Sequence, residues 1–235
     1  MKALLLLFSA LKIGKLLTSA GSMLVTVAVQ AMFYGWRFAA GLVGLLFVHE
    51  MGHYLAAKQR RLDVGLPFFI PFVGAWINLR EAPPDAETEA YVAYAGPFVG
   101  TLGAFICFFI GRETGDKLWF ALAQAGFFLN LFNLMPLHPL DGGRITAVLS
   151  PRIWFLGVPM LVALFYVHPS PILILIAIFA LPSLLKAWRY DPAAPENARY
   201  YGVSGRVRFE YTALYLGLAA ILAVEMTEAD RMLGR

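Results

Sequence analysis

The chain has 235 residues, of which 60% are hydrophobic and only 14% are charged, and its formal net charge is +4. Soluble domains are about half apolar and about a quarter charged, so this composition excludes an ordinary soluble protein and indicates a polytopic membrane protein. The positive charge does not indicate a nucleic-acid-binding protein, because the sequence has no long basic tract interleaved with aromatic residues. The single cysteine, Cys107, excludes an internal disulfide.

The N-terminal segment, residues 1–20, combines a leucine run with Lys12 and Lys15. The two lysines make the segment amphipathic, which favours an uncleaved helix at the membrane interface over a cleaved signal peptide. A short apolar segment, residues 22–34, follows. The first full membrane span is therefore expected at the next apolar segment, residues 38–57.

This span carries the motif His49-Glu50-Met51-Gly52-His53 near its C-terminal end. On a helix, positions i and i+4 lie on one face, so His49 and His53 can bind one metal ion. Glu50 lies beside them and can accept a proton from a metal-bound water. The arrangement is typical of zinc peptidases, although H-E-x-x-H alone also occurs by chance.

Residues 62–80 do not have a helical pattern, because Pro67 and Pro71 interrupt them. Residues 68–70 and 75–79 predict two short strands of a β-hairpin, or a re-entrant loop at membrane depth.

Five further apolar segments predict membrane spans. They comprise residues 90–110, 118–134, 153–167, 172–188 and 210–224. The sequence thus predicts an all-α polytopic membrane protein with about six transmembrane helices, an N-terminal interfacial helix and a small hairpin or re-entrant loop. We expect one domain over residues 1–235, with a catalytic core at about residues 35–150 and C-terminal helices at residues 152–226.

The basic residues predict the orientation of the spans, because cytoplasmic loops are enriched in lysine and arginine. The predicted cytoplasmic set is Lys58, Arg60, Arg61, Arg80, Arg144, Arg152, Lys186, Arg189, Arg199, Arg206 and Arg208. The smaller set on the other side is Arg37, Arg112, Lys117, Arg231 and Arg235. We therefore expect the histidine motif to lie within the cell membrane but toward the cytoplasm.

Asp141 is the predicted third metal ligand. A catalytic zinc site usually has three protein ligands and keeps the fourth position for water. An acidic side chain at membrane depth is energetically unfavourable and indicates function, and Asp141 lies at a depth similar to that of His53. It belongs to a segment of predicted irregular backbone, residues 137–144. The neighbouring His138 can be a ligand or a substrate contact, but we favour a structural role because three ligands suffice.

Other charged residues near these positions have simpler interpretations. Arg144 either pairs with Asp141 or marks the cytoplasmic side, and we favour the second interpretation. Glu87 and Glu89 are expected to face water at the start of their span.

Two motifs together resemble the site-2 protease family of intramembrane zinc metalloproteases. H-E-M-G-H inside a span is followed by N-L-M-P-L-H-P-L-D-G-G-R at residues 133–144, and the family's second motif has an Asn, a Pro three residues on and an L-D-G. Residues 71–77 and Ala95-Gly96-Pro97 also resemble family segments, and the resemblance extends from about residue 35 to residue 150. Gly100 departs from the pattern, because many members have Asn or another polar residue there.

The resemblance implies one zinc ion per chain, with His49, His53 and Asp141 as ligands and Glu50 as catalytic base. It implies cleavage of membrane-spanning proteins such as anti-sigma factors, membrane-bound regulators or signal-peptide remnants. Asn133 is the candidate oxyanion donor, because it belongs to the second motif and a side-chain amide can donate such a hydrogen bond. Some members carry PDZ or CBS domains, but we expect neither here, because residues 60–89 are too few for a PDZ domain and the C-terminal tail is too short for CBS domains.

The predicted hairpin offers a candidate edge for an unwound substrate. The alternative functional class is a membrane zinc or proton transporter, since histidines and acidic residues within a membrane also suit ion transport. In that class Glu50 is a ligand or a proton carrier instead of a base.

Overall fold

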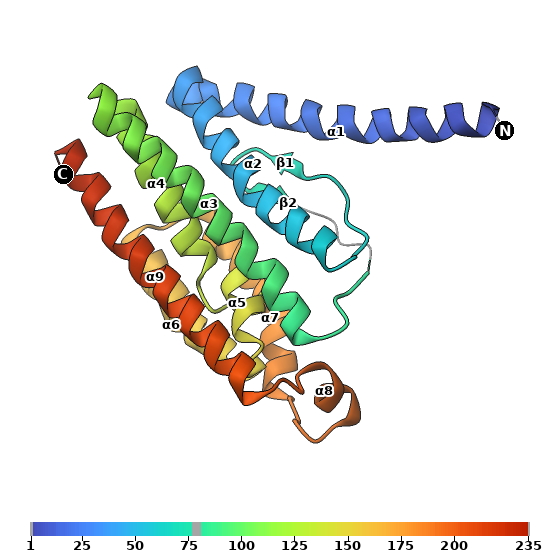
Figure 1. The fold of residues 1–235 in the computed structure, drawn as a ribbon. Helices are drawn as coiled ribbons and strands as arrows, with labels where there is room; N and C mark the ends of the chain where they lie inside the picture. The colour runs from blue at the N-terminus through green and yellow to red at the C-terminus, as the bar shows by residue number, and fades with distance from the viewer. Residues whose placement is uncertain (1, 77–80, 235) are drawn as a thin grey trace.

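The computed structural model describes residues 2–76 and 81–234, and helices dominate this part of the chain (Figure 1). The N-terminal half contains α1 (Lys2–Tyr34), α2 (Trp36–Gln59), β1 (Phe68–Ile70), β2 (Gly74–Trp76), α3 (Ala86–Thr114) and α4 (Lys117–Asn133). The C-terminal half contains α5 (Asp141–Thr146), the 3₁₀ helix η1 (Pro151–Leu156), α6 (Gly157–Val167), α7 (Pro171–Trp188), α8 (Pro195–Tyr200) and α9 (Gly205–Leu233). The predicted all-α polytopic fold with a small hairpin is confirmed.

Five helices of the described chain are long and apolar enough to cross a membrane. These segments are Leu16–Tyr34, Trp36–Gln59, Ala86–Thr114, Pro171–Trp188 and Gly205–Leu233. Two other predicted spans form helices that are shorter than these five. α4 has 17 residues, and the apolar stretch Pro151–Val167 is divided between η1 and α6. The last span, predicted at residues 210–224, extends over the 29 residues of α9.

The N-terminus differs from the sequence prediction. Residues 1–20 and 22–34 were expected as an interfacial helix and a short apolar segment, but α1 is one helix of 33 residues that extends away from the bundle (Figure 1). Two serines in the middle of α1 attach it to the segment around β1, because Ser19 donates to the Pro67 carbonyl at 2.5 Å and Ser22 accepts from the Phe69 N–H at 3.1 Å. The predicted headgroup contacts of Lys12 and Lys15 concern side chains outside the described ones.

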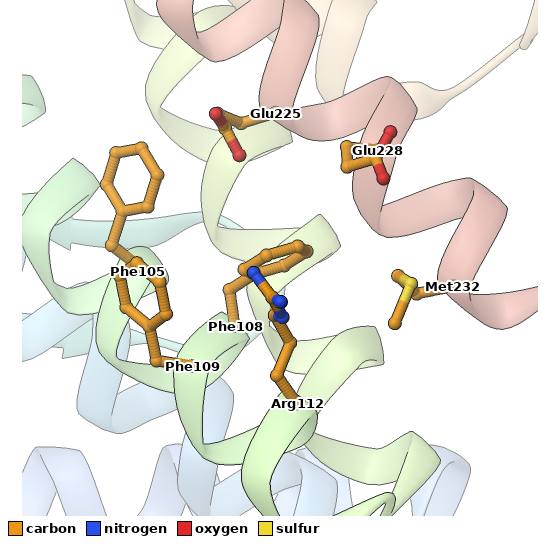
Figure 2. Close-up of a pocket in the computed structure, with 7 residues that line it drawn as sticks. All are labelled: Phe105, Phe108, Phe109, Arg112, Glu225, Glu228 and Met232. Atoms are coloured by element: carbon orange, nitrogen blue, oxygen red, sulfur yellow. The ribbon is translucent and has the colours of Figure 1, made fainter.

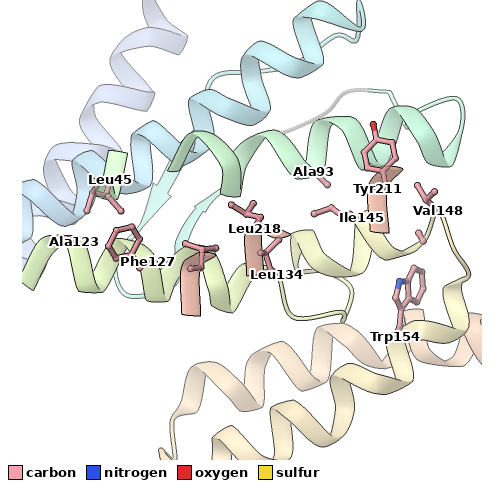
Figure 3. Close-up of a cluster of buried hydrophobic side chains, with 14 of the residues drawn as sticks. Leu45, Ala93, Ala123, Phe127, Leu134, Ile145, Val148, Trp154, Tyr211 and Leu218 are labelled. Carbon is pink, nitrogen blue, oxygen red and sulfur yellow. The ribbon is translucent and has the colours of Figure 1, made fainter. Parts of the chain in front are cut away.

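The core of the bundle lies between α2, α3, α4 and α9. α4 packs against both α3 and α9, while α3 also packs along α2. Buried apolar side chains such as Leu45, Phe127 and Leu218 meet in this space (Figure 3). The core thus fixes the position of α3 relative to α2, which carries the histidine motif.

The hairpin connects the first helices to one another. β1 and β2 pair antiparallel, with Phe69 opposite Ala75 and Ile70 opposite Gly74. β1 packs against α1, and β2 packs against α2. The predicted second strand, residues 75–79, begins at Gly74, and its residues 77–79 lie outside the described part of the chain.

The segment after α4 is tightly folded. α4 ends at Asn133, and α5 begins at Asp141, so the predicted irregular segment 137–144 is irregular only as far as residue 140. A Cβ atom on Gly142 would lie 2.1 Å from the Leu134 carbonyl oxygen, so only glycine permits this packing. The Trp154 indole N–H donates to the Gly143 carbonyl at 2.7 Å. These contacts fix the position of Asp141 at the first turn of α5.

Candidate metal centre

Three side chains from distant parts of the sequence meet at one point. His49 and His53 of α2 place their Nε2 atoms 3.1 Å apart, and each Nε2 lies 3.2 Å from Oδ2 of Asp141. The three residues are 3%, 7% and 6% exposed. His49, His53 and Asp141 form a group that can hold a metal ion.

Hydrogen bonds fix the tautomers of both histidines. Nδ1 of His53 lies 2.8 Å from the Val92 carbonyl oxygen, which can only accept, so this Nδ1 carries the proton. Nδ1 of His49 lies 2.8 Å from Oδ1 of Asn130, whose amide nitrogen donates to the Gly126 carbonyl. His49 must therefore also donate from Nδ1. Both Nε2 atoms then direct lone pairs at the same point, as metal-ligating histidines do.

The donor set fits a zinc ion. Ligand bonds of about 2.0 to 2.2 Å in a tetrahedral site separate the ligand atoms by about 3.3 to 3.6 Å. The observed separations of 3.1 and 3.2 Å are close to this range. Two imidazole lone pairs and a carboxylate oxygen repel one another at this distance unless a cation lies between them. Imidazole and carboxylate ligands suit zinc among the common metals.

Gly96 of α3 makes room for the His53 ring. A Cβ atom at this position would lie 2.2 Å from Nε2 of His53. Pro97 follows and lacks a backbone N–H, which interrupts the hydrogen-bond ladder of α3 beside the turn that holds Val92. The Ala95-Gly96-Pro97 segment thus brings α3 against the metal centre.

The other predicted site residues lie in different surroundings. Glu50 is 7% exposed on α2, next to His49 in sequence. Asn133 donates one amide N–H to the Leu129 carbonyl at 3.0 Å and is half-buried. His138 lies outside the three-residue group, because its Nδ1 pairs with the Ser183 hydroxyl at 2.9 Å. Its ring packs near Trp154, so the favoured structural interpretation of His138 agrees with its contacts.

One residue at the centre was missed by the sequence reasoning, and two others have contacts that it did not favour. Asn130 was not singled out, although it is 2% exposed and contacts His49. For Arg144 the cytoplasmic-side interpretation was favoured over pairing with Asp141, but its guanidinium lies 3.5 Å from Oδ1 of Asp141. Glu89 was expected to face water, but it pairs with Arg144 at 3.4 Å and accepts from Tyr200 at 2.6 Å. Only Asn130 gave a sequence signal, since a polar side chain inside an apolar segment requires a partner.

A separate cavity of about 450 Å³ lies away from this centre (Figure 2). It is lined by the C-terminal turns of α3 and α9, with three phenylalanines, Arg112, two glutamates and Met232. None of these lining residues belongs to the three-residue metal group.

Comparisons with known proteins found similarity to zinc metalloproteases. Residues 37–115 match the model of peptidase family M50. The chain is 32% identical over 129 residues to a zinc metalloprotease of Methanocaldococcus jannaschii, which covers 51% of this chain and 37% of that protein. It is 35% identical over 78 residues to a probable chloroplastic zinc metalloprotease of Arabidopsis thaliana, which covers 31% of this chain and 14% of that protein.

One solved structure is also similar. It is the site-2 protease from Methanocaldococcus jannaschii, with a TM-score of 0.46 and 24% sequence identity over 72% of this chain and 87% of that chain. The chain spans less than half the length of the two curated relatives named above.

Proposed function

We propose that this chain belongs to the site-2 protease family, peptidase family M50, and that it is an intramembrane zinc metalloprotease. The observation that carries the proposal is the meeting of two imidazole Nε2 atoms and a carboxylate oxygen within a helical membrane bundle. The proposed catalytic unit comprises about residues 35–150, within one domain that includes the C-terminal helices.

The proposed zinc ligands are His49, His53 and Asp141. A zinc ion held there would supply a Lewis acid that lowers the pKa of a bound water to roughly 7. Asn130 and the Val92 carbonyl hold the two imidazole rings in the tautomer that ligation requires.

Glu50 is the proposed general base. It follows His49 directly on α2 and can take a proton from the attacking water and deliver it to the leaving amine. Asn133 is the proposed oxyanion donor, because one of its two amide hydrogens binds the Leu129 carbonyl and the other is left for substrate.

The proposed substrates are membrane-spanning segments of other proteins, with single-span regulators such as anti-sigma factors and signal-peptide remnants as candidates. A helix hides its carbonyl groups, so the substrate must become extended before hydrolysis. The hairpin β1–β2 lies against α1 and α2 and can accept such an extended segment as an additional strand.

The proposed active site opens toward the cytoplasm. His53 lies six residues before the end of α2, which corresponds to about 9 Å at 1.5 Å per residue. The basic cluster that follows α2 favours the cytoplasmic side for this end of the bundle.

The deciding experiment compares membrane proteomes of cells that express the wild type or Glu50→Gln. We expect single-span proteins to accumulate uncleaved with Glu50→Gln, while the purified variant still binds zinc because the three ligands are intact. Glu87→Gln, a glutamate of the first turn of α3, is the matched control and should leave the proteome unchanged.

Unchanged substrates together with altered zinc flux in Glu50→Gln would instead support a transporter.

The role of Asn133 is tested by measuring the turnover of a cleaved single-span protein. Asn133→Ala is expected to lose ~10² to 10³ in turnover, as for other oxyanion donors. Turnover within about threefold of wild type would contradict the role of Asn133.

A further inference from the structure

The two oxygens of the Asp141 carboxylate have different neighbours. Oδ2 faces Nε2 of both histidines at 3.2 Å, whereas Oδ1 lies 3.5 Å from a terminal nitrogen of Arg144. A carboxylate that binds a metal through one oxygen needs a second interaction to stop its rotation, and ligand carboxylates are generally hydrogen-bonded in this way.

Arg144 is itself held from the other side. Its Nε lies 3.4 Å from Oε1 of Glu89, which projects from the first turn of α3. The side chains of Arg144 and Glu89 are each only 18% exposed, so the solvent screens this ion pair less than a surface pair. Without Glu89, the long Arg144 side chain on the short helix α5 would have other rotamers to adopt.

Glu89 is in turn held by Tyr200 from α8. The Tyr200 hydroxyl donates to Oε2 of Glu89 at 2.6 Å, although the two residues are 111 positions apart in sequence. Burial and the adjacent Glu89 carboxylate raise the pKa of Tyr200 well above its usual value, so the hydroxyl keeps its proton at neutral pH. The Tyr200 ring packs on Tyr201, whose carbonyl accepts from Arg208 at 3.3 Å.

We propose that Arg144, Glu89 and Tyr200 form a positioning relay that orients Asp141 for metal binding and connects it to the segment between α7 and α9. The relay rests on the proposed zinc site but is independent of the reaction catalysed there. Arg144 restrains Oδ1, Glu89 restrains Arg144, and Tyr200 restrains Glu89. A displacement of α8 is therefore transmitted to a metal ligand without contact between α8 and the ligand itself.

The test measures metal binding by the purified full chain without any substrate. Zinc affinity is determined by competition with a chromophoric chelator, and the geometry of the site by the visible spectrum of the cobalt-substituted protein. Arg144→Gln and Glu89→Gln should each weaken zinc binding about tenfold, within the range for residues that support ligands. The double variant should lose no more zinc affinity than the more strongly affected of the two single variants, because both residues act on Asp141 through one chain of contacts.

Tyr200→Phe removes a single hydroxyl and keeps the ring, so it serves as the variant least harmful to folding. It should shift the cobalt spectrum and weaken zinc binding about threefold, whereas Tyr201→Phe, the adjacent control, should change neither. A wild-type spectrum and zinc affinity in both Tyr200→Phe and Glu89→Gln would overturn the relay, as would additive losses in the double variant. If the variants show these effects on metal binding but the wild type cleaves no membrane protein, the relay stands and only the proposed function is contradicted.

Discussion

The proposed ligands of the metal centre depend on neighbouring residues as much as on their own chemistry. His49 can donate from Nδ1 only because Asn130 presents its amide oxygen 2.8 Å away. Asn130 fits only because position 100 is glycine, since a Cβ atom there would lie 2.3 Å from the same amide oxygen. Gly100 is also the position where the sequence departs from the family pattern. Asn130 from α4 therefore occupies space that a polar residue at position 100 of α3 would take.

This shared space predicts a compensating exchange. Asn130→Gly should weaken zinc binding ~10-fold by removing the acceptor for His49, and Gly100→Asn should do the same by displacing Asn130. In the double variant, the asparagine at position 100 has the vacated space, so zinc affinity should return to within about threefold of wild type. The measurement is chelator competition on purified protein. A double variant no better than Asn130→Gly would show that the two positions are not exchangeable.

At the scale of elements, α1 determines which edge of the hairpin is open. The Phe69 N–H points to Ser22 of α1, so the outer edge of β1 is already covered. Phe69 and Ala75 lie opposite each other in the antiparallel pair. Two opposed residues either bond to each other or both direct their N–H and C=O groups outward. Because Phe69 directs its N–H away from β2, Ala75 directs its backbone groups away from β1. The edge for an additional strand is therefore the backbone of β2 at Ala75.

Removing the N–H at this edge should separate substrate binding from metal binding. Ala75→Pro is expected to reduce cleavage at least about tenfold, because proline cannot donate to an added strand, while zinc affinity remains unchanged. Ala75→Val keeps the N–H and is the matched control, with cleavage expected near the wild-type rate. Cleavage by Ala75→Pro at the rate of Ala75→Val would exclude strand addition at β2.

At the scale of the whole molecule, the two ends of the bundle have different charge. One end carries the ion pair between Arg37 and Asp116, at 3.0 Å, where α2 and α4 begin. The other end carries Lys58, Arg60 and Arg61 at the end of α2, where Arg60 lies over the Tyr91 ring at 4.3 Å. The helices between these ends expose large apolar side chains, such as Ile178 and Phe209, which suits contact with lipid.

This asymmetry predicts the topology of the chain. Ala193→Cys, in the exposed loop between α7 and α8, should react with a membrane-impermeant maleimide only after the cells are opened. Glu113→Cys, near the end of α3, should react in intact cells. The wild type supplies the background, because its Cys107 is buried. The reverse labelling pattern would place the metal centre toward the outer face and contradict the proposed orientation.

The sequence by itself determined the class of molecule and the three candidate ligands. Membrane spans follow from apolar segments of sufficient length, and metal ligands belong to a few residue types whose presence at membrane depth is unfavourable without a function. The hairpin was also predictable, because prolines and strand-forming residues act locally. These features depend on residues close in sequence or on composition.

Only the tertiary structure decided which residues support the ligands. Asn130 contacts His49 across 81 positions, and Tyr200 contacts Glu89 across 111 positions, so no local pattern contains either pair. The attachment of α1 to the hairpin was decided in the same way, because Ser19 and Ser22 bond to the segment around β1, more than 40 positions away. Hydrogen-bond partners of polar groups are set by which helices pack together, and packing depends on the whole chain.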